Sequence, residues 1–189
     1  LKLSKFGFRA EDFSQEWSVL PMPRGTTLDD PTLDLCNAKF VSESGRAERR
    51  QLSVGKNPSP FAFLSSEVVR YESVDAANAA LKELKKVLED CKSLGGYKDA
   101  TGNLVPYTFR SLPTFPNTLV TENNRVMVHA TIGSGAESRQ MLAFYQFNGS
   151  MFTGLYILTA SETQFTEAQA AKWLKVAGTI AQRLQGKSA

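Results

Sequence analysis

The sequence predicts an α+β fold in which an antiparallel β-sheet is covered on one face by two main α-helices. Two amphipathic segments, about residues 74–92 and 167–184, predict the helices, and short runs of alternating apolar and polar residues predict hairpin strands. The length of 189 residues, with 42% hydrophobic and 22% charged residues, fits a single globular domain. We expect residues 36–189 to form this domain and residues 1–35 to be an irregular lead-in.

Residues 1–35 are interrupted by turn-forming residues at Met22-Pro23-Arg24-Gly25 and at Asp30-Pro31, which disfavour a regular element. The same segment contains four aromatic residues: Phe6, Phe8, Phe13 and Trp17. Because these side chains favour burial, we expect the lead-in to pack against the body of the domain.

Two strands are predicted before the first helix, at residues 48–54 and 66–71, with Asn57-Pro58-Ser59-Pro60 ending the first of them. The first strand overlaps a basic cluster, Arg46-Ala47-Glu48-Arg49-Arg50. We interpret this cluster as a solvated strand edge that discourages pairing between molecules, in preference to a site for phosphate or nucleic acid.

The helix at about residues 74–92 is the clearest element. Ser73 is a suitable N-cap, Asp75 lies in the first turn, and Gly95-Gly96 ends the helix. Apolar residues recur every three or four positions and predict one buried face: Val74, Ala77, Leu81, Leu84, Leu88 and Cys91.

The second half predicts strands followed by a helix. Residues 95–117 contain Pro106, Pro113 and Pro116, which disfavour a central strand. Residues 125–132 alternate in the face of the strand to which their side chains point, with apolar residues at every second position. We expect this strand to pair with residues 119–121 through a turn at Asn123-Asn124. Residues 140–147 and 151–159 flank Asn148-Gly149, a strong hairpin signal. A capping box, Thr166 to Gln169, begins a helix that ends near Leu184.

The composition argues against several classes of function. A net charge of +3 is too small to imply a nucleic-acid partner, and no apolar run is long enough to span a membrane. One His and two Cys leave few ways to build a metal site, and no GxGxxG pattern predicts a nucleotide. We therefore expect no metal and no cofactor. The chain begins at Leu1 rather than Met, so we expect it to be processed or to belong to a longer protein.

His129 is the obvious catalytic candidate, because it alone titrates near neutral pH without any perturbation. It lies within a predicted strand, however, and no GxSxG motif precedes a helix. We expect no catalytic residues and a protein that is not an enzyme; a hydrolase that uses His129 is the weaker alternative.

The sheet carries aromatic and basic side chains that are suited to binding. Tyrosine combines apolar area with a polar tip, and arginine provides charge-assisted hydrogen bonds. The alternative is that the aromatic rings fill the core. The residues predicted to bind a ligand are Arg70, Tyr71, Arg125, His129, Tyr145 and Tyr156.

From their number and spacing alone, Cys36 and Cys91 are as well explained by a disulfide as by two buried, reduced thiols.

The chain resembles the extracellular sensor domains of mycobacterial PknH-type Ser/Thr kinases and the related secreted lipoproteins of actinobacteria. The resemblance covers about residues 8–185 and contains no catalytic motif. It is carried by Leu35-Cys36-Asn37, Ser42-Glu43, Arg46, Arg50-Gln51, Glu67-Val68-Val69-Arg70-Tyr71, Ala76-Ala77, Ala80-Leu81 and Cys91.

The resemblance implies a sensor-like domain outside the cytoplasm, either secreted or tethered to the membrane by a segment beyond these residues. It also implies a disulfide between Cys36 and Cys91 and a cleft that binds a ligand. The chain lacks the second disulfide of that family. We expect the partner to be a small molecule, a cell-envelope component or another protein. The alternative function is a carrier that holds a lipid or another hydrophobic ligand in an apolar cavity.

Overall fold

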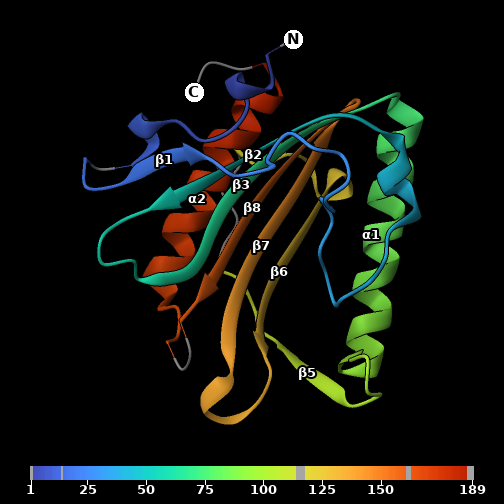
Figure 1. The fold of residues 1–189 in the computed structure, drawn as a ribbon, viewed down its shortest axis with the longest axis vertical. Coiled ribbons are helices and arrows are strands. Elements are labelled where there is room, and N and C mark those ends of the chain that lie inside the picture. The colour runs from blue at the N-terminus through green and yellow to red at the C-terminus, as the bar shows by residue number, and fades with distance from the viewer. Residues whose placement is uncertain (1, 14, 114–117, 161–162, 187–189) are drawn as a thin grey trace.

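The protein is an α+β structure with an eight-stranded antiparallel sheet and two main helices (Figure 1). The structure, a computed structural model, describes residues 2–13, 15–113, 118–160 and 163–186. The helices are α1 (Val74–Leu94) and α2 (Glu167–Leu184). The strands are β1 (Ser18–Pro21), β2 (Arg46–Gly55), β3 (Phe61–Tyr71), β4 (Gly96–Lys98), β5 (Leu104–Phe109), β6 (Arg125–Ile132), β7 (Arg139–Asn148) and β8 (Met151–Thr159).

The strand order is β1-β2-β3-β8-β7-β6-β5-β4, so β8, the last of these eight strands in chain order, lies in the middle of the sheet. Strand β8 pairs with β3 through Val69 and Phe152, among others, and with β7 through Phe147 and Phe152. Two short 3₁₀ segments precede β1, η1 (Leu3–Lys5) and η2 (Ala10–Asp12), and three more lie between strands: η3 (Val41–Gly45), η4 (Glu122–Asn124) and η5 (Gly135–Glu137).

The two helices pack against opposite faces of the sheet, and the prediction that both cover one face is wrong. Leu84 of α1 belongs to a core cluster with Val128 and Tyr145, whereas Leu174 of α2 belongs to a cluster with Phe144 and Leu155. Phe144 and Tyr145 are consecutive on β7, point to opposite faces and are both fully buried. The nearly continuous apolar run of β7 is therefore the pattern of a strand that is buried on both faces.

Both predicted helices and their caps are confirmed. The Ser73 hydroxyl accepts a hydrogen bond from the Ala76 N–H, and Gly95 ends α1 with a left-handed φ of 73°. Thr166 and Gln169 form the predicted capping box at the start of α2.

One strand prediction is wrong. Residues 119–121 form no strand; Leu119 and Val120 are buried instead, and η4 leads directly into β6. The segment 95–113 contributes no central strand, as its prolines predict, but it contains two short strands, β4 and β5, at one edge of the sheet, and β5 includes Pro106. Residues 114–117, with Pro116, lie outside the described residues.

The lead-in, predicted to be irregular, contains β1 and contacts both cores. Phe8 is buried in the cluster under α2, and Leu33 and Leu35 are buried in the cluster under α1. Arg183 near the end of α2 donates to the Gly7 carbonyl (3.1 Å) and pairs with Asp12 at 2.5 Å, with both charged side chains buried.

Candidate functional site

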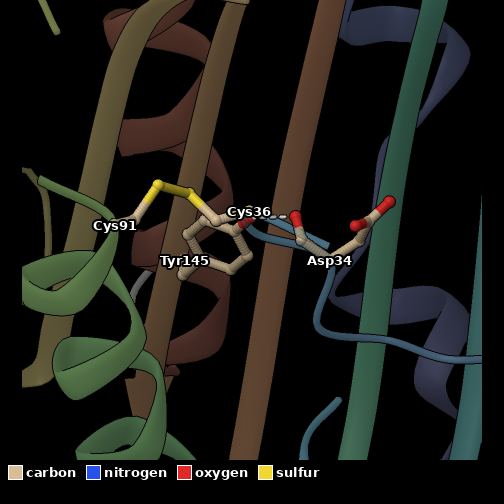
Figure 2. Close-up of a disulfide and its surroundings, with 4 residues drawn as sticks. All are labelled: Asp34, Cys36, Cys91 and Tyr145. Carbon is tan, nitrogen blue, oxygen red and sulfur yellow. Dashed lines mark hydrogen bonds between the residues drawn. A yellow bond between two sulfur atoms is a disulfide. The ribbon is translucent and has the colours of Figure 1, made fainter. Parts of the chain in front are cut away.

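The candidate site lies beneath residues 24–36, a segment that we call the strap. The strap crosses the α1 side of the sheet, and a disulfide joins its last residue, Cys36, to Cys91 of α1. Figure 2 shows this bond beside Tyr145, whose hydroxyl donates to the Asp34 carbonyl at 2.9 Å. The structure thus contains the disulfide that the family resemblance implies, and it fastens the strap to the helix.

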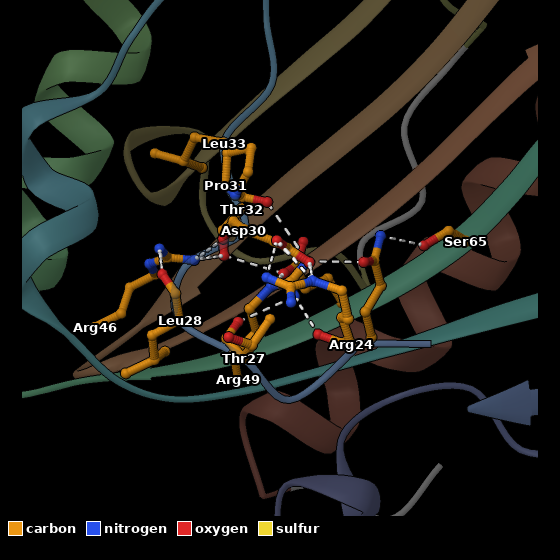
Figure 3. Close-up of polar contacts among 12 residues, drawn as sticks. Arg24, Thr27, Leu28, Asp30, Pro31, Thr32, Leu33, Arg46, Arg49 and Ser65 are labelled. Atoms are coloured by element: carbon orange, nitrogen blue, oxygen red, sulfur yellow. Dashed lines mark hydrogen bonds and ion pairs between the residues drawn. The ribbon is translucent and has the colours of Figure 1, made fainter. Parts of the chain in front are cut away.

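Arg46 of β2 binds the strap through its guanidinium group (Figure 3). It donates to the carbonyls of Leu28 (2.6 Å) and Asp30 (2.8 Å) and to the Thr32 hydroxyl (2.8 Å). Its side chain is almost completely buried, at 4% exposure. Such charge-assisted hydrogen bonds to backbone carbonyls fix the path of a segment that has little regular structure.

Arg49 makes a second set of contacts to the strap. It donates to the carbonyls of Arg24 and Thr27, each at 3.2 Å, and to the Gln51 side-chain oxygen at 2.7 Å. The prediction of a solvated basic edge is therefore wrong for Arg46 and Arg49. Both side chains are buried because the strap covers this half of β2 and supplies acceptors for their N–H groups.

Glu67 on β3 is the acidic partner of Arg49. It is 1% exposed, forms an ion pair with Arg49 Nε, and accepts a hydrogen bond from the Thr32 hydroxyl at 3.0 Å. Burial raises the pKa of Glu67 to about 7, although Arg49 and Thr32 both favour the ionised form. Glu67 therefore binds a proton more readily than an exposed glutamate does.

A pocket of about 250 Å³ lies between the strap and the sheet, with Glu67 in its lining. The other polar lining residues are Thr32, Asp34 and Gln51. The aromatic and aliphatic lining residues are Phe63, Tyr107, Tyr156, Pro31, Ile132, Met141, Ile157 and Leu158. A concave site with a few polar groups among apolar walls is the usual form of a small-molecule pocket.

Asp34 is the second acidic residue of this strap pocket and is exposed to solvent. Its surroundings still desolvate the carboxyl group enough to raise its pKa. Burial also raises the pKa of the hydroxyl groups of Tyr107 and Tyr156, so both remain protonated at neutral pH.

The Tyr156 ring occupies the space above Gly154, its neighbour on the same face of β8. A Cβ atom on Gly154 would lie 2.2 Å from the Tyr156 hydroxyl oxygen, so only glycine leaves room for the ring. From this position the Tyr156 hydroxyl donates to the Thr32 carbonyl at 3.3 Å, and the ring packs edge-on against Tyr145.

Three of the six predicted ligand-binding residues lie on the α1 side of the sheet. Tyr71 and Tyr145 are fully buried in the core cluster, which agrees with the alternative that the rings fill the core. Tyr156 is the one predicted residue that lines the strap pocket.

The other three lie on the α2 side. Arg70 pairs with Glu48 at 2.6 Å, and Arg125 donates to the Val120 carbonyl at 2.6 Å. A ring nitrogen of His129 lies 3.0 Å from the Ser111 carbonyl oxygen. The six residues are thus divided between two faces and form no common surface; whether any of them binds a ligand stays a prediction.

The sequence interpretation missed Asp34, Arg49 and Glu67. Glu67 is an acidic residue that interrupts an apolar strand next to Val68-Val69, and Gly154 is a glycine in the interior of another strand. Both are signals of a special environment. Asp34 gives no such signal, because its place at the pocket depends on the path of the strap.

Two further features concern only the part of the chain that the structure describes. No group of three or more His, Cys, Asp and Glu side chains is placed to hold a metal ion there. Within the same residues, neither helix combines the length and the apolar character that crossing a membrane requires.

Comparison with known proteins gives one structural likeness to report. No protein-family model matches the chain, and no curated protein matches it in sequence. A solved structure, the extracellular domain of PknH from Mycobacterium tuberculosis, is similar with a TM-score of 0.49 and 16% sequence identity, over 76% of this chain and 67% of that chain. Likeness at this level supports no inference about function.

Proposed function

We propose that this chain is a non-enzymatic, extracytoplasmic domain that binds a small ligand in the strap pocket. The observation that carries the proposal is a pocket of about 250 Å³ that combines the buried Glu67 carboxyl group with apolar and aromatic walls. A charged group that is kept 1% exposed at the wall of a pocket is costly to folding, and such groups cluster at functional sites.

The disulfide supports a place outside the cytoplasm. Disulfides form and persist in oxidising compartments, whereas cytosolic thiols are kept reduced. Cys36 and Cys91 are both buried, and their bond links two segments that are 55 residues apart. This bond has a structural role, because it fixes one wall of the pocket to α1.

Binding is better supported than catalysis. His129, the only histidine in the sequence, lies on the α2 side of the sheet, whereas the strap pocket opens on the α1 side. Glu67 is engaged by Arg49 and Thr32, contacts that hold the carboxyl group in place rather than leave it to exchange protons with a substrate.

The size of the pocket favours a small molecule over a lipid. Pockets for drug-sized ligands span about 300–1,000 Å³, and the strap pocket, at about 250 Å³, falls just below that range. A buried carboxyl group is also a poor neighbour for an acyl chain. Soluble metabolites and fragments of the cell envelope are the two sources of ligand to be screened.

Methionine-methyl NMR tests the proposal. The chain has four methionines, Met22, Met127, Met141 and Met151, and of these Met141 lines the strap pocket. With ¹³C-methyl methionine and the disulfide intact, a screen of metabolites and envelope fragments should give compounds that shift the Met141 signal more than the other three.

Two tryptophan variants provide the control. Leu158→Trp places a large ring in the pocket and should abolish these shifts, whereas Leu104→Trp adds the same ring at an exposed position on β5 and should leave them unchanged. A screen in which no compound selects Met141, or in which Leu158→Trp binds as well as the parent protein, would overturn the proposal.

A further inference from the structure

The hydrogen-bond donors of the strap pocket are largely used within the protein. The hydroxyl groups of Thr32 and Tyr156 have one proton each, which they donate to Glu67 and to the Thr32 carbonyl. The Gln51 amide donates one of its two N–H groups to Ser65 at 2.9 Å while its oxygen accepts from Arg49. Among the polar groups of the lining, the second Gln51 N–H and the Tyr107 hydroxyl are the donors that no described contact accounts for, so a ligand that needs several donors from the protein would find few of them here.

The acceptors, by contrast, are available. Both contacts to the Glu67 carboxylate end on Oε1, and within the described residues Oε2 accepts no hydrogen bond. No donor from the same residues reaches the Asp34 carboxylate. A ligand that donates hydrogen bonds would therefore satisfy groups that the fold leaves open.

The charged residues that line the pocket are also acidic. Its twelve described lining residues include two acids, Asp34 and Glu67, and no Lys, Arg or His. Arg49 contacts Glu67 through Nε, but its other N–H groups point to strap carbonyls and to Gln51 rather than into the pocket. Desolvation raises the pKa of both acids, as expected where negative charge lacks full compensation.

The remaining lining residues suit the organic part of an amine. Phe63, Tyr107 and Tyr156 offer aromatic rings, which attract a cation over their faces. Met141 and Leu158 provide apolar surface for a hydrocarbon group.

We infer that the strap pocket takes a small amphipathic amine, with its ammonium group between the carboxylates of Asp34 and Glu67 and its apolar part against Met141 and Leu158. The inference rests on the proposed function, because it names the ligand class of the same site. An ammonium group supplies up to three donors and one positive charge, which are what the open acceptors lack.

Three matched probes test the ligand class: phenethylamine, 2-phenylethanol and 3-phenylpropionate. They share a phenyl ring on a short chain and differ in carrying an ammonium, hydroxyl or carboxylate group. Each probe is titrated into the protein, and binding is measured by calorimetry and by the shift of the Met141 methyl signal. Phenethylamine should bind about tenfold more tightly than 2-phenylethanol, and 3-phenylpropionate should bind more weakly still.

Variants that neutralise one acid at a time test which carboxylates hold the ammonium group. Asp34→Asn and Glu67→Gln should each weaken phenethylamine binding roughly fivefold while changing 2-phenylethanol binding less than about twofold. Asp29→Asn makes the same chemical change on an exposed strap residue outside the pocket and should leave both affinities unchanged. Because Asp34 is exposed, Asp34→Asn remains informative even if Glu67→Gln impairs folding.

The outcomes separate this inference from the proposed function. Equal or tighter binding of the alcohol or the carboxylate would overturn the amine class and leave a ligand-binding pocket in place. The same conclusion follows if screening compounds shift Met141 but phenethylamine does not. If neither the probes nor any screened compound shifts Met141, both proposals fail together.

Discussion

At the scale of single residues, Tyr71 and Tyr145 are a matched pair that differ at the hydroxyl group. Both are fully buried in the core under α1, but only the Tyr145 hydroxyl has a hydrogen-bond acceptor, the Asp34 carbonyl. The Tyr71 hydroxyl has no partner among the described residues. A buried polar group without a partner costs free energy that a phenyl ring would not.

The first prediction follows from this difference. Tyr71→Phe should leave the free energy of unfolding unchanged or raise it by about 1 kcal/mol, because the desolvated hydroxyl is removed. Tyr145→Phe should lower it by about 1 kcal/mol, because the strap loses a hydrogen bond. Urea denaturation of the two variants measures both effects; equal losses in the two would contradict the assignment.

The second prediction concerns the pH dependence of stability. Burial raises the pKa of Glu67 on folding from its ordinary value of 4.5 to about 7. The folded state then binds more protons than the unfolded state between these values, so stability falls as pH rises through this window. Glu67→Gln should remove this contribution, roughly 3 kcal/mol between pH 4.5 and pH 7.5.

The measurement is the free energy of unfolding at several pH values for both proteins. The charged and titratable groups around Glu67 are Arg49, Glu43, Arg46, Asp34, Tyr71, Tyr145 and Tyr156. Asp34 also has a raised pKa, so it contributes a slope of the same sign in both proteins. Glu89→Gln, at an exposed position of α1, should retain the full slope of the parent.

Residue types alone could not identify the site. The sequence leaves the tyrosines open between core and binding surface, and only the sheet register shows that Tyr145 is buried while Tyr156 reaches the pocket. Arg49 and Glu67 form their ion pair across neighbouring strands, and a sequence does not state which strands are neighbours. Tyr156 was the one predicted residue that the pocket includes.

At the scale of elements, local signals predicted the helices and the main strands. The N-caps Ser73 and Thr166 and the Asn148-Gly149 hairpin depend on residues within a few positions, so one sequence is enough to recognise them. Strands β4 and β5 were missed because they are short and contain Gly96 and Pro106, residues that usually interrupt a strand.

The third prediction concerns β8, where Gly154 leaves room for the Tyr156 ring. Gly154→Ala should lower the free energy of unfolding by about 1–3 kcal/mol, because the added methyl group displaces a ring that the strap holds in place. In a Tyr156→Ala background the same change should cost less than about half as much. Thermal denaturation of the four proteins completes this double-mutant cycle, and an equal cost in both backgrounds would exclude the ring as the cause.

At the scale of the whole molecule, the sequence predicts the α+β class correctly, but the predicted placement of both helices on one face is wrong. The amphipathic stripes show that each helix buries one face, yet they do not show which face of the sheet each one meets. Strand β7 indicates that the sheet is covered on both faces, because its consecutive residues Phe144 and Tyr145 are both buried.

The fourth prediction concerns the disulfide, which joins the strap to α1 across 55 residues. Cys36→Ala with Cys91→Ala should lower the free energy of unfolding by about 4 kcal/mol, because the unfolded chain regains the freedom of a closed loop. The strap amides should also exchange faster with deuterated solvent. A reducing agent should act on the parent protein in the same way and leave the double variant unchanged; a double variant as stable as the parent would contradict this role.

The position of β8 has a consequence for how the protein is made. Residues 46–71 and 125–148 form two separate parts of the sheet, which only β8, at residues 151–159, brings together. Until a ribosome has delivered that strand, β3 and β7 each present an open edge to which other chains can bind. The sheet therefore stays in two separate halves until residues 151–159 have been made, and a chain that is terminated before them is expected to expose both edges and to aggregate.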